Sequence, residues 1–388
     1  MEKRRICKIL FGTECAATVI AGTVFTIFVM AVSLTAGKYL GLFFKTQFHL
    51  DKSPLSTFLL AIILGMIVRN SFRLPESFEP GIRFCLTKLL RLGIILMGIR
   101  LSIVAVARIG LLAVGIVAVC IASGIVVSSL LARWFGVSDR IGTLIAAGTG
   151  ICGVSAIIAT APTIGAKEEE TAYAVSTITV FGLMATILYP FLVEWVFRFD
   201  AGQAGLFLGT AVHDTAQVTG AAYIYDQLWM KDVSTVAITT KLVRNSFLMV
   251  VVPLCAVLYA RNTASEGAAG SRKVKIRKLF PFFVLGFVIL ALFRSVGDLF
   301  VSGESGRFLF WRSGGSWESF HGTVKTLAET VLICAIAGAG LSTQFAKLKT
   351  LSFKPFVIGL IAAMTVGIVS YFLVTLFHDP IRALVSGL

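Results

Sequence analysis

The sequence predicts an all-α polytopic membrane protein with about eleven transmembrane helices, inverted structural repeats and discontinuous helices that cross one another. Two observations predict the class: 57% of the 388 residues are hydrophobic and only 14% are charged, and many apolar runs reach the roughly 18–20 residues that span a bilayer as a helix. Soluble globular domains are about 45–50% apolar and about 25% charged. The composition therefore excludes a secreted disulfide scaffold, a soluble enzyme and a disordered chain.

Apolar stretches form eleven candidate membrane spans, at 16–37, 55–69, 86–106, 110–132, 141–164, 172–197, 203–225, 233–260, 279–299, 322–345 and 353–377. With a cytoplasmic N-terminus, these spans place 21 Lys and Arg residues on the cytoplasmic side and 12 on the other side. Because Lys and Arg accumulate in cytoplasmic loops, the N-terminus is predicted inside and the C-terminus outside. The same bias explains the net charge of +15 without a nucleic-acid partner. We expect a multi-pass protein of the cell (inner) membrane, surrounded by the lipid bilayer.

The seven cysteines are scattered, with no C-x-x-C pair and no histidine at ligand spacing. Isolated cysteines in apolar stretches usually pack as small hydrophobic residues. No metal site and no cofactor are therefore expected.

Two pairs of segments resemble each other within the chain. MGIRLS (97–102) resembles AGAGLS (337–342), and GTGICGVSAIIATAP (148–162) resembles GTAVHDTAQVTGAAY (209–223). The spans that carry the first pair are seven apart and so cross the membrane in opposite directions, as an inverted repeat requires. The two Gly-Thr segments are two spans apart and would run parallel if both cross fully. Either one of them is re-entrant or the pairing is permuted.

The first Gly-Thr segment contains G-x-G-x-x-G, followed by the acidic run 168–170. A dinucleotide fingerprint needs a soluble strand–helix unit, and this segment lies among membrane spans. Its small residues could serve close helix packing. The alternative that we favour is a broken helix, whose exposed main-chain N–H groups attract anions. The candidate binding residues are Gly148, Thr149, Gly150, Gly153 and Ser155.

The second Gly-Thr segment carries ionisable and polar residues inside an apolar span. Such residues are costly at membrane depth and usually mark a pathway or a partner. Gly209, Thr210, His213 and Gln217 are candidate binding residues. His213 and Asp214 are also candidate groups for coupling to an ion, because buried imidazoles and carboxylates change their proton affinity readily. The alternative is that Asp214 only pairs with a cation on a neighbouring helix.

The next span supplies cations in the sequence KLVRN. Lys241 and Arg244 are three residues apart and share one helical face with Asn245. Long basic side chains near helix ends can extend to the membrane surface, but these two lie well inside the span. We therefore expect Lys241, Arg244 and Asn245 to face a polar cavity, where the two cations favour a small anion.

The motifs GTGICGVSAIIATAPTIGAKEEE, GTAVHDTAQVTGAA and KLVRN, with the upstream RLGIILMGIRLS, together resemble the YeiH-type (UPF0324) sulfate exporter family of bacterial inner membranes. The resemblance covers the chain from about Pro54 onward, and the first span matches least. It implies a relation to the bile-acid/sodium symporter-like transporters, whose fold has inverted repeats and crossing broken helices. It also implies a core domain beside a panel domain, and an oxyanion substrate such as sulfate or a related sulfur compound.

On this basis the chain forms a single transmembrane transporter domain, 1–388. Residues 16–140 would hold the first helices, including the first panel elements, and 141–260 the core with two broken-helix hairpins. A basic cytoplasmic linker would follow at 261–278. The last three helices, with the second panel elements, would occupy 279–388.

The residues favour a secondary transporter, in the role of exporter, that moves a small anion by alternating access with proton or sodium coupling. No G-x-x-x-x-G-K-[ST] motif for ATP is present. An anion channel is an alternative, since it differs in rate and coupling rather than in sequence. A hydrolase using Ser155, His213 and Asp214 is another, which the G-V-S-A-I context of Ser155 disfavours. We expect no enzyme activity. The substrate, the direction and the oligomeric state, a homodimer included, are left open.

Overall fold

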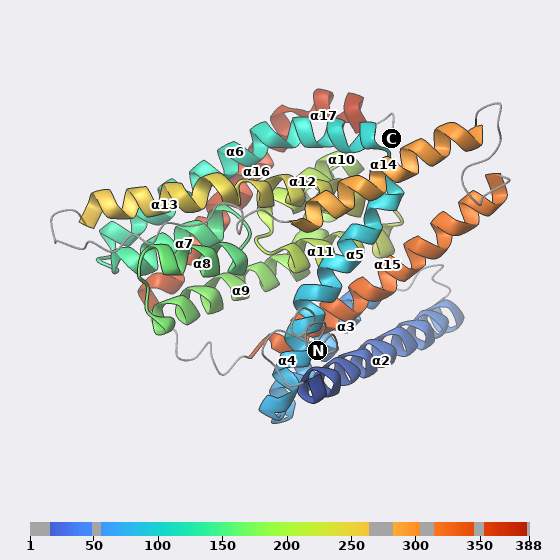
Figure 1. Cartoon of the computed structure of the whole chain (residues 1–388), viewed down its shortest axis with the longest axis horizontal. Coiled ribbons are helices and arrows are strands. Elements are labelled where there is room, and N and C mark those ends of the chain that lie inside the picture. Colours follow the sequence, from blue (N-terminus) through green and yellow to red (C-terminus); the bar gives the residue numbers. More distant parts are fainter. Residues whose placement is uncertain (1–15, 49–55, 264–281, 303–313, 345–352, 386–388) are drawn as a thin grey trace, which may run out of the picture. The chain divides into compact units, whose positions relative to one another are not determined.

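The computed structural model describes residues 16–48, 56–263, 282–302, 314–344 and 353–385 (Figure 1). Every regular element in these ranges is a helix, which confirms the predicted all-α class. The chain divides into two compact units, each assembled from segments that are far apart in the sequence. The predicted basic linker lies outside the described residues from 264 onward.

Six helical segments of the described chain are long and apolar enough to cross a membrane: Thr18–Leu40, Ile103–Trp134, Glu168–Phe197, Phe282–Val301, Ser316–Ser342 and Phe353–Leu376. A seventh is obtained if Ser234–Ser246 and Leu248–Cys255, which meet at a bend of 41°, form one span. The coarse prediction of a polytopic helical protein is confirmed at this level.

The five other predicted spans correspond to helices that are short or interrupted. The stretch 55–69 becomes the 15-residue helix α3 (Thr57–Ser71). The other four stretches are each divided among two or more helices, because small residues, prolines or polar residues interrupt the regular main-chain bonding. A count of long unbroken helices therefore gives a smaller number than a count of apolar stretches.

Unit 1 contains α2 (Ala16–Phe48), α3, η1 (Glu76–Phe78), α4 (Glu79–Phe84), η2 (Cys85–Leu89), α5 (Leu90–Met97), η3 (Gly98–Arg100), the end of α11 (Thr215–Trp229), most of α14 (Phe282–Ser302) and α15 (Gly314–Ser342). Helix α15 packs closely along α3. A Cβ atom at Gly65 of α3 would lie 2.7 Å from the Ala337 oxygen and 3.0 Å from the Cα of Gly340. The AGAGLS motif thus provides the small residues at which these helices touch.

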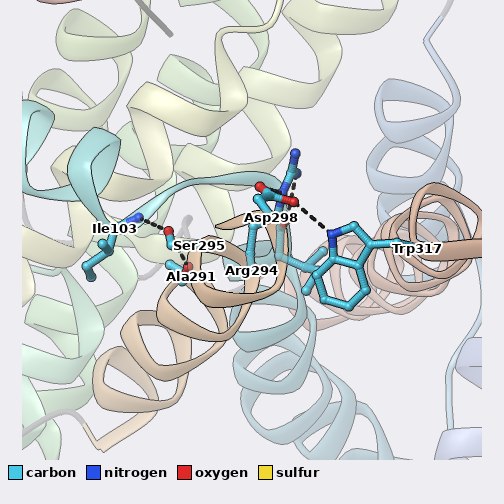
Figure 2. A network of polar contacts seen from close by, with 7 residues as sticks. Ile103, Ala291, Arg294, Ser295, Asp298 and Trp317 are labelled. Atoms are coloured by element: carbon cyan, nitrogen blue, oxygen red, sulfur yellow. Dashed lines mark hydrogen bonds and ion pairs between the residues drawn. The ribbon is translucent and has the colours of Figure 1, made fainter. Parts of the chain in front are cut away.

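The MGIRLS motif ends in a break between η3 and α6 (Ile103–Trp134), and α14 satisfies the main chain there (Figure 2). Arg294 donates from Nη1 to the Ile99 oxygen at 3.0 Å. The N–H of Ile103 donates to Ser295 Oγ at 2.7 Å. Asp298 holds Arg294 through a 2.9 Å ion pair and accepts the indole N–H of Trp317 at 2.7 Å. Ionisable side chains inside this span therefore pair with each other and with freed main-chain groups.

Unit 2 contains most of α6, then α7 (Asp139–Gly150), α8 (Val154–Thr160), η4 (Ala161–Thr163), α9 (Glu168–Phe191), η5 (Leu192–Phe197), α10 (Ala201–Ala211), the start of α11, α12 (Ser234–Ser246), α13 (Leu248–Thr263), α16 (Phe353–Leu376) and α17 (His378–Val385). Helices α7 and α8 pack against each other and against α9 (Figure 1). Buried Leu144, Ile145, Ile157 and Ile178 join the three helices in one apolar cluster. The first Gly-Thr segment thus folds back on itself as a hairpin.

The acidic run 168–170 begins α9. Glu170 Oε2 accepts the main-chain N–H of Lys167 at 2.8 Å. Acidic residues in the first turn of a helix also interact favourably with its dipole. The run therefore starts a helix.

Candidate functional site

Two helices of unit 2 are interrupted at matching residues of the internal repeat. Helix α7 ends just before Ile151 and α10 just before Val212. When 148–162 is aligned with 209–223, Ile151 and Val212 occupy the same position. The sequence similarity thus corresponds to a shared structural feature, a helix that stops at the same residue.

The Thr side chain of each Gly-Thr pair bonds within its own helix. The Thr149 hydroxyl donates to the Ile145 oxygen at 2.5 Å. The Thr210 hydroxyl lies 2.6 Å from the Leu206 oxygen and 2.6 Å from the Ser370 hydroxyl of α16. Both threonines are fully buried, so their main-chain oxygens are the atoms that they offer to neighbouring groups.

The two breaks meet at Gly153 and Asp214. Gly153 has φ +60° and ψ −121°, a conformation that only glycine adopts without strain. A Cβ atom on Gly153 would lie 3.5–3.6 Å from the Cβ, Cα and N atoms of Asp214. The first break therefore passes directly over the main chain of the second.

Lys241 of α12 binds the main chain of both breaks. Its Nζ donates to the oxygens of Ile151 at 3.2 Å and of Val212 at 2.9 Å, and also to the oxygen of His213. A lysine ammonium has three N–H donors, so these three oxygens occupy all of them.

Arg244, one turn further along α12, also donates to main-chain oxygens of both segments, at residues just before the two breaks. Nε donates to the Gly150 oxygen at 3.1 Å, Nη2 to the Thr149 oxygen at 2.6 Å, and Nη1 to the Thr210 oxygen. Thr149 and Thr210 match in the repeat, as Ile151 and Val212 do. Each cation thus joins a matching pair of oxygens. Of the five guanidinium N–H donors, two are left over.

These cations are fully buried, and neither has a carboxylate oxygen within 4.0 Å among the described residues. Their counter-charge is the partial negative charge at the C-terminal ends of α7 and α10. Such a terminus carries roughly half an elementary charge, so the two ends together offset about one of the two positive charges, and the Asp214 carboxylate lies within electrostatic range of Lys241.

Asp214 caps the start of α11. Its Oδ1 accepts the N–H of Ala216 at 2.9 Å, while its own N–H donates to Gln217 Oε1 at 3.2 Å. Gln217 Nε2 donates in turn to the Thr179 oxygen of α9 at 3.2 Å. The amide thus satisfies the main-chain N–H of Asp214 and the carboxylate satisfies that of Ala216 in the first turn, an arrangement close to a capping box.

An equivalent box starts α10, where the Gln203 N–H donates to Asp200 Oδ1 at 2.8 Å and the Asp200 N–H donates to Gln203 Oε1 at 3.3 Å. Both boxes have the pattern D-x-x-Q, which a search for helix starts would have found. Our sequence interpretation considered Gln217 as a binding group and Asp214 as a coupling group or as the partner of a cation on a neighbouring helix, and it missed this capping role.

The start of α8 has no such cap. In the repeat, Gly153 occupies the position of Asp214, and glycine has no side chain that could cap the helix. The N–H groups of Val154 and Ser155 have no acceptor among the described residues. Ser155 is exposed. One of the two breaks therefore presents open hydrogen-bond donors.

Two further predicted residues are buried with one unsatisfied atom each. His213 Nδ1 and Asn245 Oδ1 have no partner in the part of the chain that is described. Asn245 Nδ2 donates to Thr215 Oγ1 at 3.1 Å, which places its amide beside the second break. No hydrogen bond within the described residues joins His213 to Ser155 or Asp214, the contact that a hydrolase of the kind considered above would need.

Three of the predicted glycines serve close packing. A Cβ atom at Gly148 would lie 2.8 Å from Ile157 of α8, and one at Gly150 would lie 3.0 Å from Ile125 of α6. One at Gly209 would lie 2.6 Å from the Cβ of Thr240 and 2.7 Å from the Ala237 oxygen. These glycines bring helices together around the breaks.

The described residues contain no group of three or more His, Cys, Asp or Glu side chains that could hold a metal ion. Glu194, an acidic residue near the end of a predicted span, forms a 2.8 Å ion pair with Lys231. Lys231, another lysine of unit 2, thus has an acidic partner, unlike Lys241 and Arg244.

The family model described as "Conserved hypothetical protein 698" matches residues 19–377. A UPF0324 membrane protein of Bacteroides thetaiotaomicron is 35% identical over 327 residues, which cover 82% of this chain and 89% of the relative. The chain belongs to the UPF0324 family. This confirms the family that the motifs resembled.

Other UPF0324 membrane proteins are similar over comparable lengths. That of Nitratidesulfovibrio vulgaris is 32% identical over 79% of each chain. That of Streptococcus pneumoniae is 29% identical over 78% of this chain and 84% of the relative. No solved structure matches the chain. The relatives are named membrane proteins, and the described residues contain six helices that are long and apolar enough to cross a membrane. This UPF0324 chain is therefore a membrane protein.

Proposed function

We propose that the protein is a secondary transporter of a small anion, that it works by alternating access, and that it is not an enzyme. The observation that carries the proposal is the pair Lys241 and Arg244, two buried cations with no carboxylate within 4.0 Å among the described residues. Charges inside membrane proteins are costly and concentrate on substrate and ion pathways. Two positive charges without an acidic partner favour an anion over a cation or a neutral solute.

The anion would bind where the two breaks meet. The free N–H groups of Val154 and Ser155 lie at the start of the helical stretch Val154–Thr163. Oxyanions bind well to such N–H groups. In the second break the Asp214 carboxylate accepts the corresponding N–H. An anion in the first break would take the place of the carboxylate that Gly153 does not supply.

The remaining predicted residues support this position in two ways. The two unused N–H donors of Arg244, and His213 Nδ1 in the tautomer that carries the proton there, are available to an anion, whereas Asn245 Oδ1 can only accept a hydrogen bond from a protonated group. The glycines at 148, 150 and 209, together with Thr149, Thr210 and Gln217, shape the breaks through packing and main-chain bonds. Lys241 contributes its charge rather than a hydrogen bond, since all its donors are occupied.

Transport would be coupled to protons through Asp214, with His213 beside it, or to sodium ions. Asp214 is partly exposed and accepts one main-chain N–H. Protonation would weaken this bond, because a charged acceptor binds an N–H more strongly than a neutral one. Proton binding would thereby loosen the start of α11 next to the anion.

We further propose that more segments cross the membrane than the six or seven long helices. The interrupted pairs α7–α8, α10–α11 and α12–α13 would complete a set of about eleven membrane segments in an inner membrane, with a cytoplasmic N-terminus and inverted repeats. The matching ends of α7 and α10 and the hairpin of α7 with α8 favour broken, crossing segments. This is the arrangement of the bile-acid/sodium symporter-like transporters.

Sulfate or a related sulfur oxyanion is the proposed substrate class, and export the proposed direction. The test is uptake by the purified protein in liposomes, with sulfate, sulfite, a sulfonate, a carboxylate and phosphate as candidate anions and an imposed pH gradient. We expect uphill accumulation of one of them. Downhill flux at channel rates would favour an anion channel instead. The absence of flux, together with no thermal stabilisation by any of the anions, would overturn the proposal.

A further inference from the structure

Gln217 connects the second break with α9 through one buried side chain. Its Oε1 accepts the Asp214 N–H at 3.2 Å and its Nε2 donates to the Thr179 oxygen at 3.2 Å. Its main-chain oxygen also lies 3.4 Å from the Thr186 hydroxyl. The amide is therefore fixed between α11 and α9, with its oxygen directed at the residue proposed to bind the proton.

A glycine on α9 makes room for this amide. A Cβ atom on Gly182 would lie 2.6 Å from Gln217 Cδ and 2.9 Å from its Nε2, and closer still to Oε1. Non-bonded atoms do not approach a Cβ this closely, so any larger residue at 182 must displace the Gln217 side chain. Gly182 thus permits the bond from the Asp214 N–H to Gln217.

We propose that Gln217, admitted by Gly182, is a positioning residue that sets the pH at which Asp214 takes up the coupling proton. This inference rests on the proposed function, since it assumes that Asp214 is the coupling group. Gln217 fixes the main chain of Asp214 so that its carboxylate accepts the Ala216 N–H at 2.9 Å. A hydrogen bond to the charged form favours that form, so the loss of this orientation favours protonation.

Three other ionisable groups lie within electrostatic range of Asp214. Lys241 approaches from α12, Cys152 from the first break, and His213 precedes Asp214 in the chain. None of these forms a hydrogen bond with Gln217 in the described residues. A substitution at 217 or 182 therefore changes the environment of Asp214 through the capping box and leaves the neighbouring charges in place.

The experiment compares the pH profile of anion uptake in liposomes for the wild type, Gln217→Ala, Gly182→Ala and the double variant. We expect each single variant to move the midpoint upward by roughly one pH unit, the scale of one hydrogen bond to a charged group. Because Gly182→Ala acts by displacing Gln217, it should add nothing once residue 217 is alanine. The double variant should match Gln217→Ala.

Two matched controls separate positioning from general destabilisation. Gln203→Ala removes the corresponding amide of the capping box at α10, and Gly115→Ala adds a Cβ that has no described atom within 4 Å apart from its own helix backbone. Both should keep the wild-type midpoint. If Gly182→Ala does not fold, the comparison of Gln217→Ala with Gln203→Ala decides the question.

Unchanged midpoints with uptake reduced equally at every pH would overturn the inference, and so would additive shifts in the double variant. A wild type that transports anions without a pH-dependent midpoint would overturn it as well, while leaving anion transport intact. A wild type that neither binds nor transports any anion would refute the proposed function itself. The failures of the two proposals are therefore distinguishable.

Discussion

Ile151 and Val212 present their main-chain oxygens to the same ammonium group, that of Lys241, at 3.2 Å and 2.9 Å. They are the residues at which the two interrupted helices stop. Neither oxygen is satisfied within its own helix, and an unsatisfied buried oxygen is costly. One lysine thus stabilises both breaks, which makes α12 the element that holds them together.

We expect Lys241→Met to destabilise the protein and to abolish anion uptake. The substitution keeps much of the side-chain volume but leaves three buried oxygens without a donor. Removal of one member of a buried charged network costs about 3–5 kcal/mol. Thermal unfolding of the detergent-purified protein, followed by size-exclusion chromatography, measures this cost.

Lys231→Met is the matched control. Lys231 pairs with Glu194, and their side chains are 38% and 23% exposed, so the loss of this pair should cost at most about 1 kcal/mol. Equal melting temperatures for the two variants would contradict the role assigned to Lys241.

A carboxylate placed at the first break should compete with the transported anion. In Ser155→Asp the new carboxylate can accept the free N–H groups at the start of α8 and also repels an approaching anion. We expect the apparent KM to rise at least about tenfold, equivalent to about 1.4 kcal/mol. Ser155→Asn has nearly the same size without the charge and should stay near the wild-type KM. Similar KM values for the two variants would argue against anion binding at this break.

The sequence was sufficient to predict the helical membrane class and to locate both breaks. Six of the eleven apolar stretches contain a long helix. The interruptions in the two Gly-Thr segments fall at I-C-G (151–153) and V-H-D (212–214), where three successive residues are weaker helix formers than alanine. The position of Lys241 and Arg244 on one helical face also followed from their spacing.

The partners of these residues could not be predicted from one sequence. Lys241 and Arg244 bind main-chain oxygens, and every residue has such an oxygen, so no pattern of side chains reveals the contact. The cap formed by Asp214 and Gln217 was visible as D-x-x-Q, but the choice between a cap and a coupling group requires knowing where α11 begins. The approach of Gln217 to Gly182 is a tertiary contact without a local sequence signal.

Asp214→Asn should abolish the pH dependence of transport while keeping the protein folded. Asparagine caps helices about as well as aspartate, so the bond to the Ala216 N–H can persist, but asparagine cannot take up a proton. We expect a flat uptake profile over the range in which the wild type responds. Asp200→Asn makes the same change in the capping box of α10 and should retain the wild-type profile. An unaltered profile in Asp214→Asn would exclude Asp214 as the coupling group.

Gly209→Ala should destabilise the protein, although alanine is the better helix former. The added Cβ would lie 2.6 Å from the Cβ of Thr240 and 2.7 Å from the Ala237 oxygen, so α10 would have to move away from α12. Overpacking of this kind costs typically 1–3 kcal/mol. The displacement would also separate the Thr210 oxygen from Arg244, so we expect a loss of anion uptake as well.

Gly115→Ala, in the middle of α6, is the corresponding control for Gly209→Ala. Apart from its own helix backbone, no described atom lies within 4 Å of the added Cβ, and alanine is favoured over glycine in a helix by up to about 1 kcal/mol. Its melting temperature should therefore equal or exceed that of the wild type, with uptake unchanged. Should Gly209→Ala behave like Gly115→Ala in both measurements, close packing of α10 against α12 would not be needed to hold the second break in place.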